Sequence, residues 1–189
     1  MKLCNAVITL VVAVAVTILH STAAENCTCG LARNQQLLQQ FNVATGGATW
    51  YILWTGSDIC SWTGVTCSGA EVIGLSVANN NLRGDFPGEI LQNLTSLRTL
   101  YLGGNQLTGS RTLASMLPHL QKFNVYDNNM TGTLPSEFGA ARAPAMTIFI
   151  VGLNQFSGTL PESYSSWTLL TQFDVYSNHL NGTLPEGFW

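Results

Sequence analysis

Few side chains in this sequence have the types and spacing that catalysis requires. Of the three histidines, His20 lies in an apolar N-terminal segment, while His119 and His179 have no serine or cysteine partner at a recognisable spacing. Asp127 and Asp174 are expected in different columns and layers of the repeat described below, which argues against a catalytic carboxylate pair. The glycines follow that repeat and form no G-x-G-x-x-G loop for a phosphate. The sequence therefore predicts a chain that is not an enzyme and holds no cofactor.

The N-terminal segment has the layout of a secretory signal peptide. It has one lysine, Lys2, near its start, continues as an apolar run over residues 6–19 and ends in small residues. The run is shorter than the roughly 20 residues of a membrane-spanning helix, which favours cleavage after Ala23 or Ala24 over a membrane anchor. We therefore expect a signal peptide at residues 1–24 and no membrane span in the mature chain. The protein would be secreted or lie on the extracellular face of the plasma membrane.

The cysteines fit disulfides better than a metal site. Removal of the signal takes Cys4 away and leaves Cys27, Cys29, Cys60 and Cys67, an even number that allows three pairings in an exported protein. We predict a bridge between Cys60 and Cys67, which enclose the short loop CSWTGVTC. Cys27 and Cys29 would need a strained ring, so their pairing stays open. There is no repeated C-x-x-C spacing for a zinc site, and we expect no metal.

The charges and the glycosylation motifs narrow the class of partner. Only 9% of the residues are charged, the net charge is -3, and the Lys and Arg residues are scattered, so no basic surface for nucleic acid is expected. Four N-x-S/T motifs agree with export and predict a glycoprotein. Their acceptors are Asn26, Asn93, Asn129 and Asn181.

One pattern recurs five times along the chain. Blocks that begin at residues 72, 97, 120, 146 and 170 follow the spacing L-x-x-L-x-L-x-x-N-x-L. Successive asparagines in the pattern are 25, 23, 26 and 24 positions apart, which is the period of a leucine-rich repeat. The asparagines are Asn80, Asn105, Asn128, Asn154 and Asn178.

Each column of the pattern has a physical role in a stack of layers. Apolar residues two positions apart, such as Phe123 and Val125, lie on one face of a short strand, and parallel strands stack about 4.8 Å apart. An inward asparagine supplies both a donor and an acceptor to the buried loop backbone, so the asparagine column is expected to form a ladder. The Gly-x-Leu-Pro tail supplies a turn and a fixed φ on the convex side. The second block departs from that tail with GSRTLASMLP, which favours a more helical convex segment.

The N-x-L-x-G-x-hydrophobic-P tail resembles the plant-specific class of leucine-rich repeats, and WTGSDICSWTGVTC at 54–67 is similar to the N-terminal capping module of that class. The GTLP segments with this cap look most like the leucine-rich repeat surface antigens of trypanosomatids. Plant receptor ectodomains and polygalacturonase inhibitors share the same features. The resemblance implies an α/β-type repeat solenoid, a horseshoe with a parallel concave sheet and an N-terminal, disulfide-containing helical cap. The cap would occupy residues 25–70, and about five repeats would occupy 71–189.

The cap implied by this resemblance contains a helix over residues 35–44. Leu37, Leu38 and Phe41 have the spacing of one helical face, which supports this helix independently. In that cap, Trp54 and Trp62 would cover the first layer of the solenoid.

Two columns are expected on the exposed concave face. One is Ser76, Tyr101, Asn124, Ile150 and Asp174, and the next is Ala78, Gly103, Tyr126, Gly152 and Tyr176. Tyrosines with polar neighbours on a rigid sheet are typical of recognition surfaces, although the same residues also suit a solvent-facing strand. The candidate ligand-binding residues are Tyr101, Asn124, Tyr126, Asp174 and Tyr176.

These observations predict a cell-surface or secreted glycoprotein that recognises a protein, peptide or glycan on its concave face. The alternatives are a mainly structural, surface-antigen-like coat glycoprotein and the ectodomain fragment of a leucine-rich repeat receptor kinase. The chain stops at Trp189 within a convex segment, so we expect a truncated C-terminal end, with Phe173, Val175 and Leu184 exposed. A membrane anchor in the missing sequence is compatible with this expectation.

Overall fold

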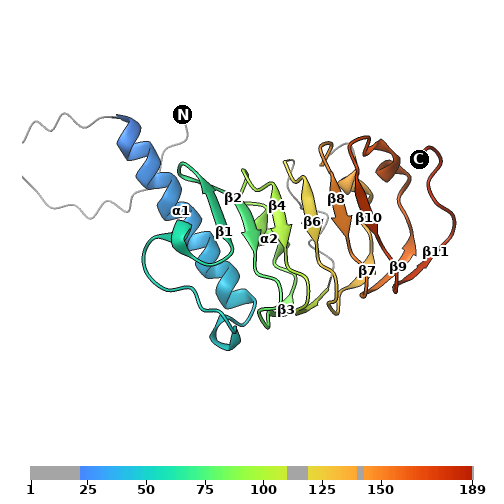
Figure 1. Ribbon diagram of the computed structural model, residues 1–189, viewed down its shortest axis with the longest axis horizontal. Helices are drawn as coiled ribbons and strands as arrows, with labels where there is room; N and C mark the ends of the chain where they lie inside the picture. The colour runs from blue at the N-terminus through green and yellow to red at the C-terminus, as the bar shows by residue number, and fades with distance from the viewer. Residues whose placement is uncertain (1–21, 110–118, 140–142, 189) are drawn as a thin grey trace, which may run out of the picture.

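The computed structural model describes residues 22–109, 119–139 and 143–188. Its main element is a six-stranded sheet in the order β1-β2-β4-β6-β8-β10, and Figure 1 shows the strands following one another along the molecule with α1 across the first end. The strands from β2 onward are parallel, one per repeat, whereas β1 pairs antiparallel with β2. Their bounds are Val65–Ser68, Glu71–Ser76, Thr99–Tyr101, Lys122–Asn124, Ile148–Ile150 and Gln172–Asp174.

The register of the sheet places the same repeat position side by side in every layer. One residue of each parallel strand, the next to last, points into the core, in the row Leu75, Leu100, Phe123, Phe149 and Phe173. Phe123 and Phe149 are almost fully buried, and burial of each contributes on the order of 2–3 kcal/mol. The alternate residues point outward, and this outward side of the sheet is the concave face. One of its rows is Ser76, Tyr101, Asn124, Ile150 and Asp174.

The asparagine column forms a repeated set of hydrogen bonds. In Asn128, Nδ2 donates to Val125 O at 3.0 Å in its own layer and to Leu102 O at 3.1 Å in the layer before, and Oδ1 accepts from Leu107 N at 2.9 Å. Asn105, Asn154 and Asn178 repeat these bonds at the equivalent positions. Each asparagine therefore ties its layer to the previous one through backbone groups that the core would otherwise leave without partners.

The first asparagine, Asn80, connects the repeats to the cap instead. Its Oδ1 accepts from Ile52 N at 2.6 Å, and its Nδ2 donates to Ile52 O at 3.2 Å. The cap loop thus takes the place of a preceding layer, and the ladder begins at this residue.

The chain leaves each strand through a left-handed turn and then forms a second, shorter set of strands. The residue before each ladder asparagine has positive φ, in Asn79, Gly104, Asp127, Leu153 and Ser177. The short strands pair as β3 with β5, and β9 pairs with β7 on one side and with β11 on the other. Their bounds are Arg83–Asp85, Gln106–Thr108, Thr131–Thr133, Gln155–Thr159 and His179–Asn181.

The convex side contains short helical turns that begin at the prolines that follow an apolar residue in the repeat tail. Pro87, Pro135 and Pro161 are the N-cap residues of α2 (Gly88–Leu91), η4 (Ser136–Phe138) and η5 (Glu162–Ser166). Proline suits this place because its fixed φ starts the turn and its missing N–H has no partner to lose. The segment GSRTLASMLP, for which we expected more helix, lies almost wholly outside the described residues.

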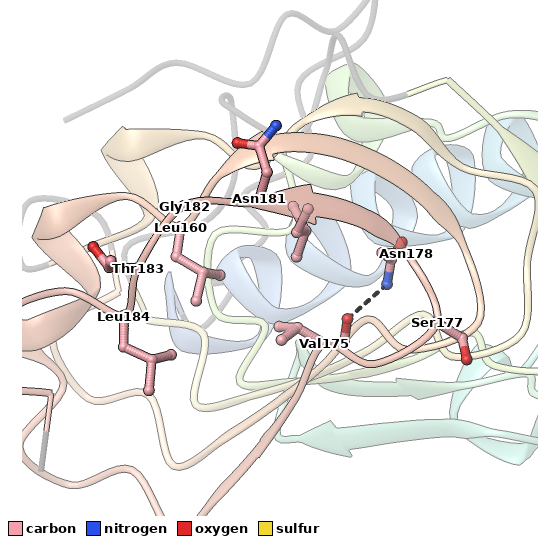
Figure 2. Close-up of a pocket in the computed structure, with 9 residues that line it drawn as sticks. Leu160, Val175, Ser177, Asn178, Asn181, Gly182, Thr183 and Leu184 are labelled. Carbon is pink, nitrogen blue, oxygen red and sulfur yellow. Dashed lines mark hydrogen bonds between the residues drawn. The ribbon is translucent and has the colours of Figure 1, made fainter.

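The last described layer, β10 and β11, is less covered than the others. We expected Phe173, Val175 and Leu184 to face water, and Leu184 is 49% exposed. Phe173 is half-buried instead, because the ring of Phe188 packs edge-on against it with 4.7 Å between the centroids. Side chains of the repeat interior line a hollow of about 310 Å³ at this layer, and Figure 2 shows Leu160, Val175 and Leu184 among them.

The cap helix α1 spans Thr22–Ala44 and is longer than expected. It ends where predicted, and Leu38 and Phe41 are fully buried, but it begins at Thr22 rather than at residue 35. Gly30 disfavours helix in the sequence pattern, yet its missing Cβ lets the helix pass close to Ala70 in the turn between β1 and β2. The signal-peptide segment 1–21 and the side chains of residues 22–29, with Asn26, Cys27 and Cys29, lie outside the described part.

The remainder of the cap packs aromatic rings over the first layer. Trp54 stacks on Trp62 with 5.0 Å between the centroids, and Trp50 meets both Trp54 and Phe41 edge-on. Each indole N–H donates to a backbone carbonyl, which satisfies the polar atom of an otherwise apolar side chain. Two short turns, η1 (Gly47–Thr49) and η2 (Ile59–Ser61), connect these rings.

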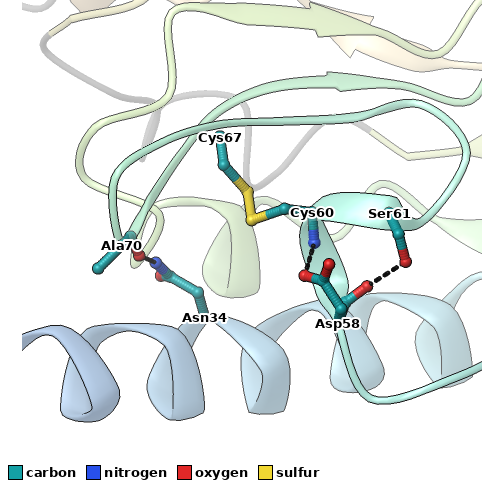
Figure 3. Close-up of a disulfide and its surroundings, with 6 residues drawn as sticks. All are labelled: Asn34, Asp58, Cys60, Ser61, Cys67 and Ala70. Carbon is teal, nitrogen blue, oxygen red and sulfur yellow. Dashed lines mark hydrogen bonds between the residues drawn. A yellow bond between two sulfur atoms is a disulfide. The ribbon is translucent and has the colours of Figure 1, made fainter.

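A disulfide between Cys60 and Cys67 confirms the predicted bridge. It joins η2 to β1, with the Cα atoms 5.7 Å apart (Figure 3). Asp58 Oδ1 accepts from Cys60 N at 3.0 Å and so holds η2 at one end of the loop. On the other side, Asn34 of α1 donates to Ala70 O at 2.8 Å. Closing a loop of this length lowers the entropy of the unfolded chain by an amount worth about 2.5 kcal/mol.

Candidate functional site

Two tyrosines meet on the concave face although they come from layers that are not adjacent. Tyr126 follows β6 and Tyr176 follows β10, and their hydroxyl oxygens are 2.6 Å apart, close enough for a hydrogen bond. The ring centroids are 6.0 Å apart, with the planes tilted by 52°. Tyr176 is 51% exposed, so the pair presents ring surface and two hydroxyl groups to a ligand.

Gly152, in the layer between them, makes this meeting possible. A Cβ at this position would lie 3.2 Å from two ring carbons of Tyr176 and 2.6 Å from Asp174 Oδ1. Any larger side chain would therefore displace the tyrosine ring or the carboxylate beneath it. The absence of a side chain at Gly152 leaves a gap that the two tyrosines close from either side.

Asn124 and Asp174 hold the two tyrosines in equivalent ways. Tyr126 N donates to Asn124 Oδ1 at 2.9 Å, and Tyr176 N donates to Asp174 Oδ1 at 3.2 Å. Both supporting residues occupy the same row of the sheet, two strands apart. These oxygens are thus already used to orient the backbone of the tyrosines.

The tyrosine pair lies in a negatively charged environment. The hydrogen bond with Tyr126, with partial desolvation and the nearby carboxylates of Asp174 and Asp127, raises the pKa of Tyr176 to about 12. An ordinary tyrosine has a pKa of about 10. Because the folded pKa is raised, this interaction contributes stability below pH of about 10 and loses it as the pH rises through about 12. The hydroxyl of Tyr176 is therefore protonated at physiological pH.

Tyr126→Phe should return the pKa of Tyr176 toward its ordinary value, since the largest cause of the shift is the hydroxyl of Tyr126. NMR of a ¹³C-tyrosine-labelled chain follows each ring separately through a pH titration. The matched control is Tyr51→Phe, which changes an exposed tyrosine of the cap and should leave the titration of Tyr176 unaltered. Titration of Tyr176 at its ordinary pH in the unmodified chain would show that the two hydroxyls do not pair.

The structure brings four of the five predicted ligand-binding residues into one cluster. Tyr126, Tyr176, Asn124 and Asp174 are connected by the hydrogen bonds above. Tyr101 lies at the end of β4 beside Asn124 in the sheet register, and it widens the same face.

The glycosylation motifs lie away from this surface. Asn93 follows α2, Asn129 lies next to the second set of strands and Asn181 is in β11. Asn129 and Asn181 are exposed, and Asn93 is partly exposed. None of these three side chains belongs to the six-stranded sheet, so sugars attached to them would leave the concave face open.

The potential catalytic groups do not assemble within the described part of the chain. His119 precedes β6, whereas His179 lies in β11, outside the six-stranded sheet. Among the described residues, no three His, Cys, Asp or Glu side chains are grouped as metal ligands. In the same part of the chain, no helix is both long and apolar enough to cross a membrane.

Sequence reasoning missed Gly152 and the left-handed Leu153 beside it. A glycine in a column of otherwise outward side chains was a usable signal for Gly152, because an empty position lets neighbours in adjacent layers meet. No comparable signal marks Leu153, whose φ is 51° and whose side chain is 36% exposed next to the tyrosine pair.

Comparison with known protein families agrees with the cap and the repeats. Residues 37–68 match the leucine rich repeat N-terminal domain, and residues 96–116 and 119–141 match the leucine rich repeat. The chain therefore has the fold of a leucine-rich repeat solenoid with an N-terminal leucine-rich repeat cap.

The similar proteins are plant receptors. The probable inactive receptor kinase RLK902 of Arabidopsis thaliana is 44% identical over 85 residues, which cover 44% of this chain and 13% of that protein. The chain spans less than a fifth of the curated relatives it matches.

Solved structures share the fold at more than 25% identity, among them the following two. The crystal structure of the BIR3–SERK2 complex from Arabidopsis thaliana is 29% identical with a TM-score of 0.63, covering 71% of this chain and 75% of that one. The plant peptide hormone receptor RGFR1 in complex with RGF2 is also 29% identical, with a TM-score of 0.51, covering 57% of this chain and 17% of that one.

Proposed function

We propose that this chain is an extracellular recognition module that binds a peptide or an extended protein segment across its concave face. The observation that carries the proposal is the pair Tyr126 and Tyr176, which meet over Gly152 with their hydroxyls 2.6 Å apart. Two tyrosines fixed by packing and by backbone hydrogen bonds offer a large contact area at little entropic cost. Ligand binding would therefore centre on the ends of β6, β8 and β10.

The similar structures support a peptide or protein ligand over a glycan. RGFR1 was solved in complex with RGF2, and BIR3 was solved in complex with SERK2. The position of the glycosylation motifs outside the six-stranded sheet is also consistent with a concave face that a ligand can reach.

The same surface serves a second candidate, the ectodomain of a longer leucine-rich repeat receptor kinase. The names of the matched relatives favour this candidate, since they are receptor kinases of which the chain spans a small share. The coat-glycoprotein alternative depends on the sequence resemblance of the GTLP repeats to trypanosomatid surface antigens alone, because the matched relatives are plant receptor kinases. A coat role needs no ligand on the concave face, and a binding experiment therefore separates it from the other two.

Selection from a displayed library of random linear peptides tests the proposal without knowledge of the natural ligand. Peptides selected on the unmodified chain should bind Gly152→Val at least about tenfold more weakly, because the new side chain displaces Tyr176 and Asp174. The measurement is the dissociation constant of each selected peptide for both proteins.

Ala78→Val is the matched control for this selection. Ala78 is exposed and occupies the equivalent position of the first repeat, where no tyrosine pair exists. Its affinity for the selected peptides should not change. If the peptides bind Gly152→Val as well as they bind the unmodified chain, the concave face around the tyrosines is not the recognition site.

A further inference from the structure

A second feature of the concave face is a hollow of about 230 Å³ near its first strands. The sheet register places Thr66, Gly74, Thr99 and Lys122 side by side in one row across β1, β2, β4 and β6. Gly74 has no side chain, so the middle of this row is open. Arg98, one residue before β4, also lines the hollow.

The hollow carries positive charge without compensation. Its lining includes Arg98 and Lys122 and contains no aspartate or glutamate. Both side chains are exposed, and within the described part of the chain neither has a hydrogen-bond or ion-pair partner. The acidic residue of β2, Glu71, accepts a hydrogen bond from Ser96 Oγ at 3.3 Å and does not line the hollow.

The remaining lining suits an anionic group. Thr66, Ser76 and Thr99 line the hollow and bring hydroxyl groups, which donate hydrogen bonds to the oxygens of a carboxylate or sulfate. Guanidinium and ammonium groups add charge-assisted hydrogen bonds to the same oxygens. Arg98 lies one residue before β4, and its carbonyl accepts from Lys122 N, the first residue of β6, at 3.0 Å, so one group in the hollow between them can contact both side chains.

The hollow lies within reach of a ligand on the tyrosine pair. It is centred near β4, and the tyrosines meet over β8, two strand spacings or about 10 Å away across the sheet. They also lie about four residues, or about 13 Å, further along the strands, so the separation is about 16 Å, the span of about five extended residues. The two ends of the face differ in charge, because Asp127 and Asp174 lie at the tyrosine end. A bound peptide would therefore have a preferred direction.

We infer that the hollow lined by Arg98 and Lys122 is a subsite for an acidic group of the peptide ligand, such as an acidic side chain. The inference rests on the proposed function, since the anionic group belongs to the ligand of the concave face. The part of the peptide that lies against β2 and β4 would therefore carry the acidic group. The opposite segment, against the tyrosines and the two aspartates, is aromatic or basic.

The test uses an acetylated, amidated tetraglutamate peptide as the probe and inorganic sulfate as the free-anion comparison. Binding is followed through the backbone amide signals of Gly74, Thr99 and Lys122 in ¹H–¹⁵N NMR spectra at low ionic strength. The peptide should bind at least about tenfold more tightly than sulfate, because it places several carboxylates within reach of the two cations. Its affinity should fall as salt is added.

The variant Arg98→Gln/Lys122→Gln should weaken peptide binding by about tenfold, as expected for the loss of two partly exposed ion pairs. The charge-conserving variant Arg98→Lys/Lys122→Arg should keep most of the affinity, which excludes a folding defect as the cause. Arg33→Gln is the matched control, since Arg33 is exposed on α1 and should not contribute.

Three results would overturn the inference. They are the absence of saturable peptide binding, equal binding to the Arg98→Gln/Lys122→Gln variant, and binding of sulfate as tight as that of the peptide, which would mean an adventitious ion only. Failure of this inference can be distinguished from failure of the proposed function. If only the anionic subsite is wrong, the selected peptides still bind the Gly152→Val variant more weakly than the unmodified chain. If the proposed function is wrong, they bind both proteins equally well.

Discussion

Asn128→Leu is expected to destabilise the chain by about 3 kcal/mol. Leucine has a similar size but cannot bond the backbone, so Leu107 N loses its partner in the core. The carbonyls of Leu102 and Val125 each lose one of two side-chain amide donors. A domain of this kind has a total stability of about 5–15 kcal/mol, so the loss is a large fraction. Denaturant unfolding of the unglycosylated chain measures it.

Asn129→Leu is the matched control, because Asn129 is the next residue in the chain but its side chain is exposed. This change should alter the free energy of unfolding by about 0.5 kcal/mol or less. Equal effects of the two substitutions would mean that the asparagine ladder does not stabilise the stack. Asn128→Asp is a useful third variant, since the carboxylate keeps the acceptor for Leu107 N and loses the donors to Val125 O and Leu102 O.

The double substitution Tyr126→Ala/Tyr176→Ala should reduce the affinity for a selected peptide by about 100-fold or more. Truncation of a tyrosine at the centre of an interface costs about 2 kcal/mol of binding free energy, and this variant removes both rings. The fold should remain intact, since Tyr176 is exposed and the backbone ladder below it does not use the rings. Isothermal titration calorimetry gives the affinity, and thermal unfolding checks the fold.

Two controls separate the contribution of the rings from that of the hydroxyl groups. Tyr126→Phe/Tyr176→Phe keeps both rings and removes the hydrogen bond between the hydroxyl oxygens. Its affinity should lie between that of the unmodified chain and that of the double alanine variant. Tyr51→Ala removes an equally large and more exposed tyrosine from the cap and should leave binding unchanged. An unchanged affinity in the double alanine variant would rule out the tyrosine pair as the binding centre.

The repeat period made the core and the sheet register predictable. Because the apolar columns recur every 23 to 26 residues, the alignment of Leu75, Leu100 and Phe123 in the sequence is also their order across the sheet. The bridge between Cys60 and Cys67 was predictable for a similar reason, since a loop this short leaves the two sulfurs close together.

Features that depend on contacts between layers were not predictable in the same way. The left-handed column contains Asn79, Gly104, Asp127, Leu153 and Ser177. Glycine, asparagine and aspartate tolerate positive φ, but leucine and serine do not favour it, so the residue types alone do not predict the turn in every layer. The turn is imposed by the layer and by the hydrogen bonds around it. In Leu153 this is clear, because its N–H donates to Tyr176 O at 3.0 Å although leucine disfavours positive φ.

The candidate site shows the same division. The outward position of Tyr126 and Tyr176 followed from the alternation along each strand. Their meeting did not, because it requires a gap at Gly152 and rings that reach across an intervening layer. The hollow at Arg98 was missed because this residue precedes its strand and does not belong to the columns of the repeat.

The most direct test of the proposed recognition surface is the structure of this chain bound to the tightest selected peptide. We predict that the peptide lies across the ends of β6, β8 and β10 and contacts the rings of Tyr126 and Tyr176 over Gly152. A peptide bound to the convex turns, or to the exposed cap residues Tyr51 and Leu53, would contradict the account.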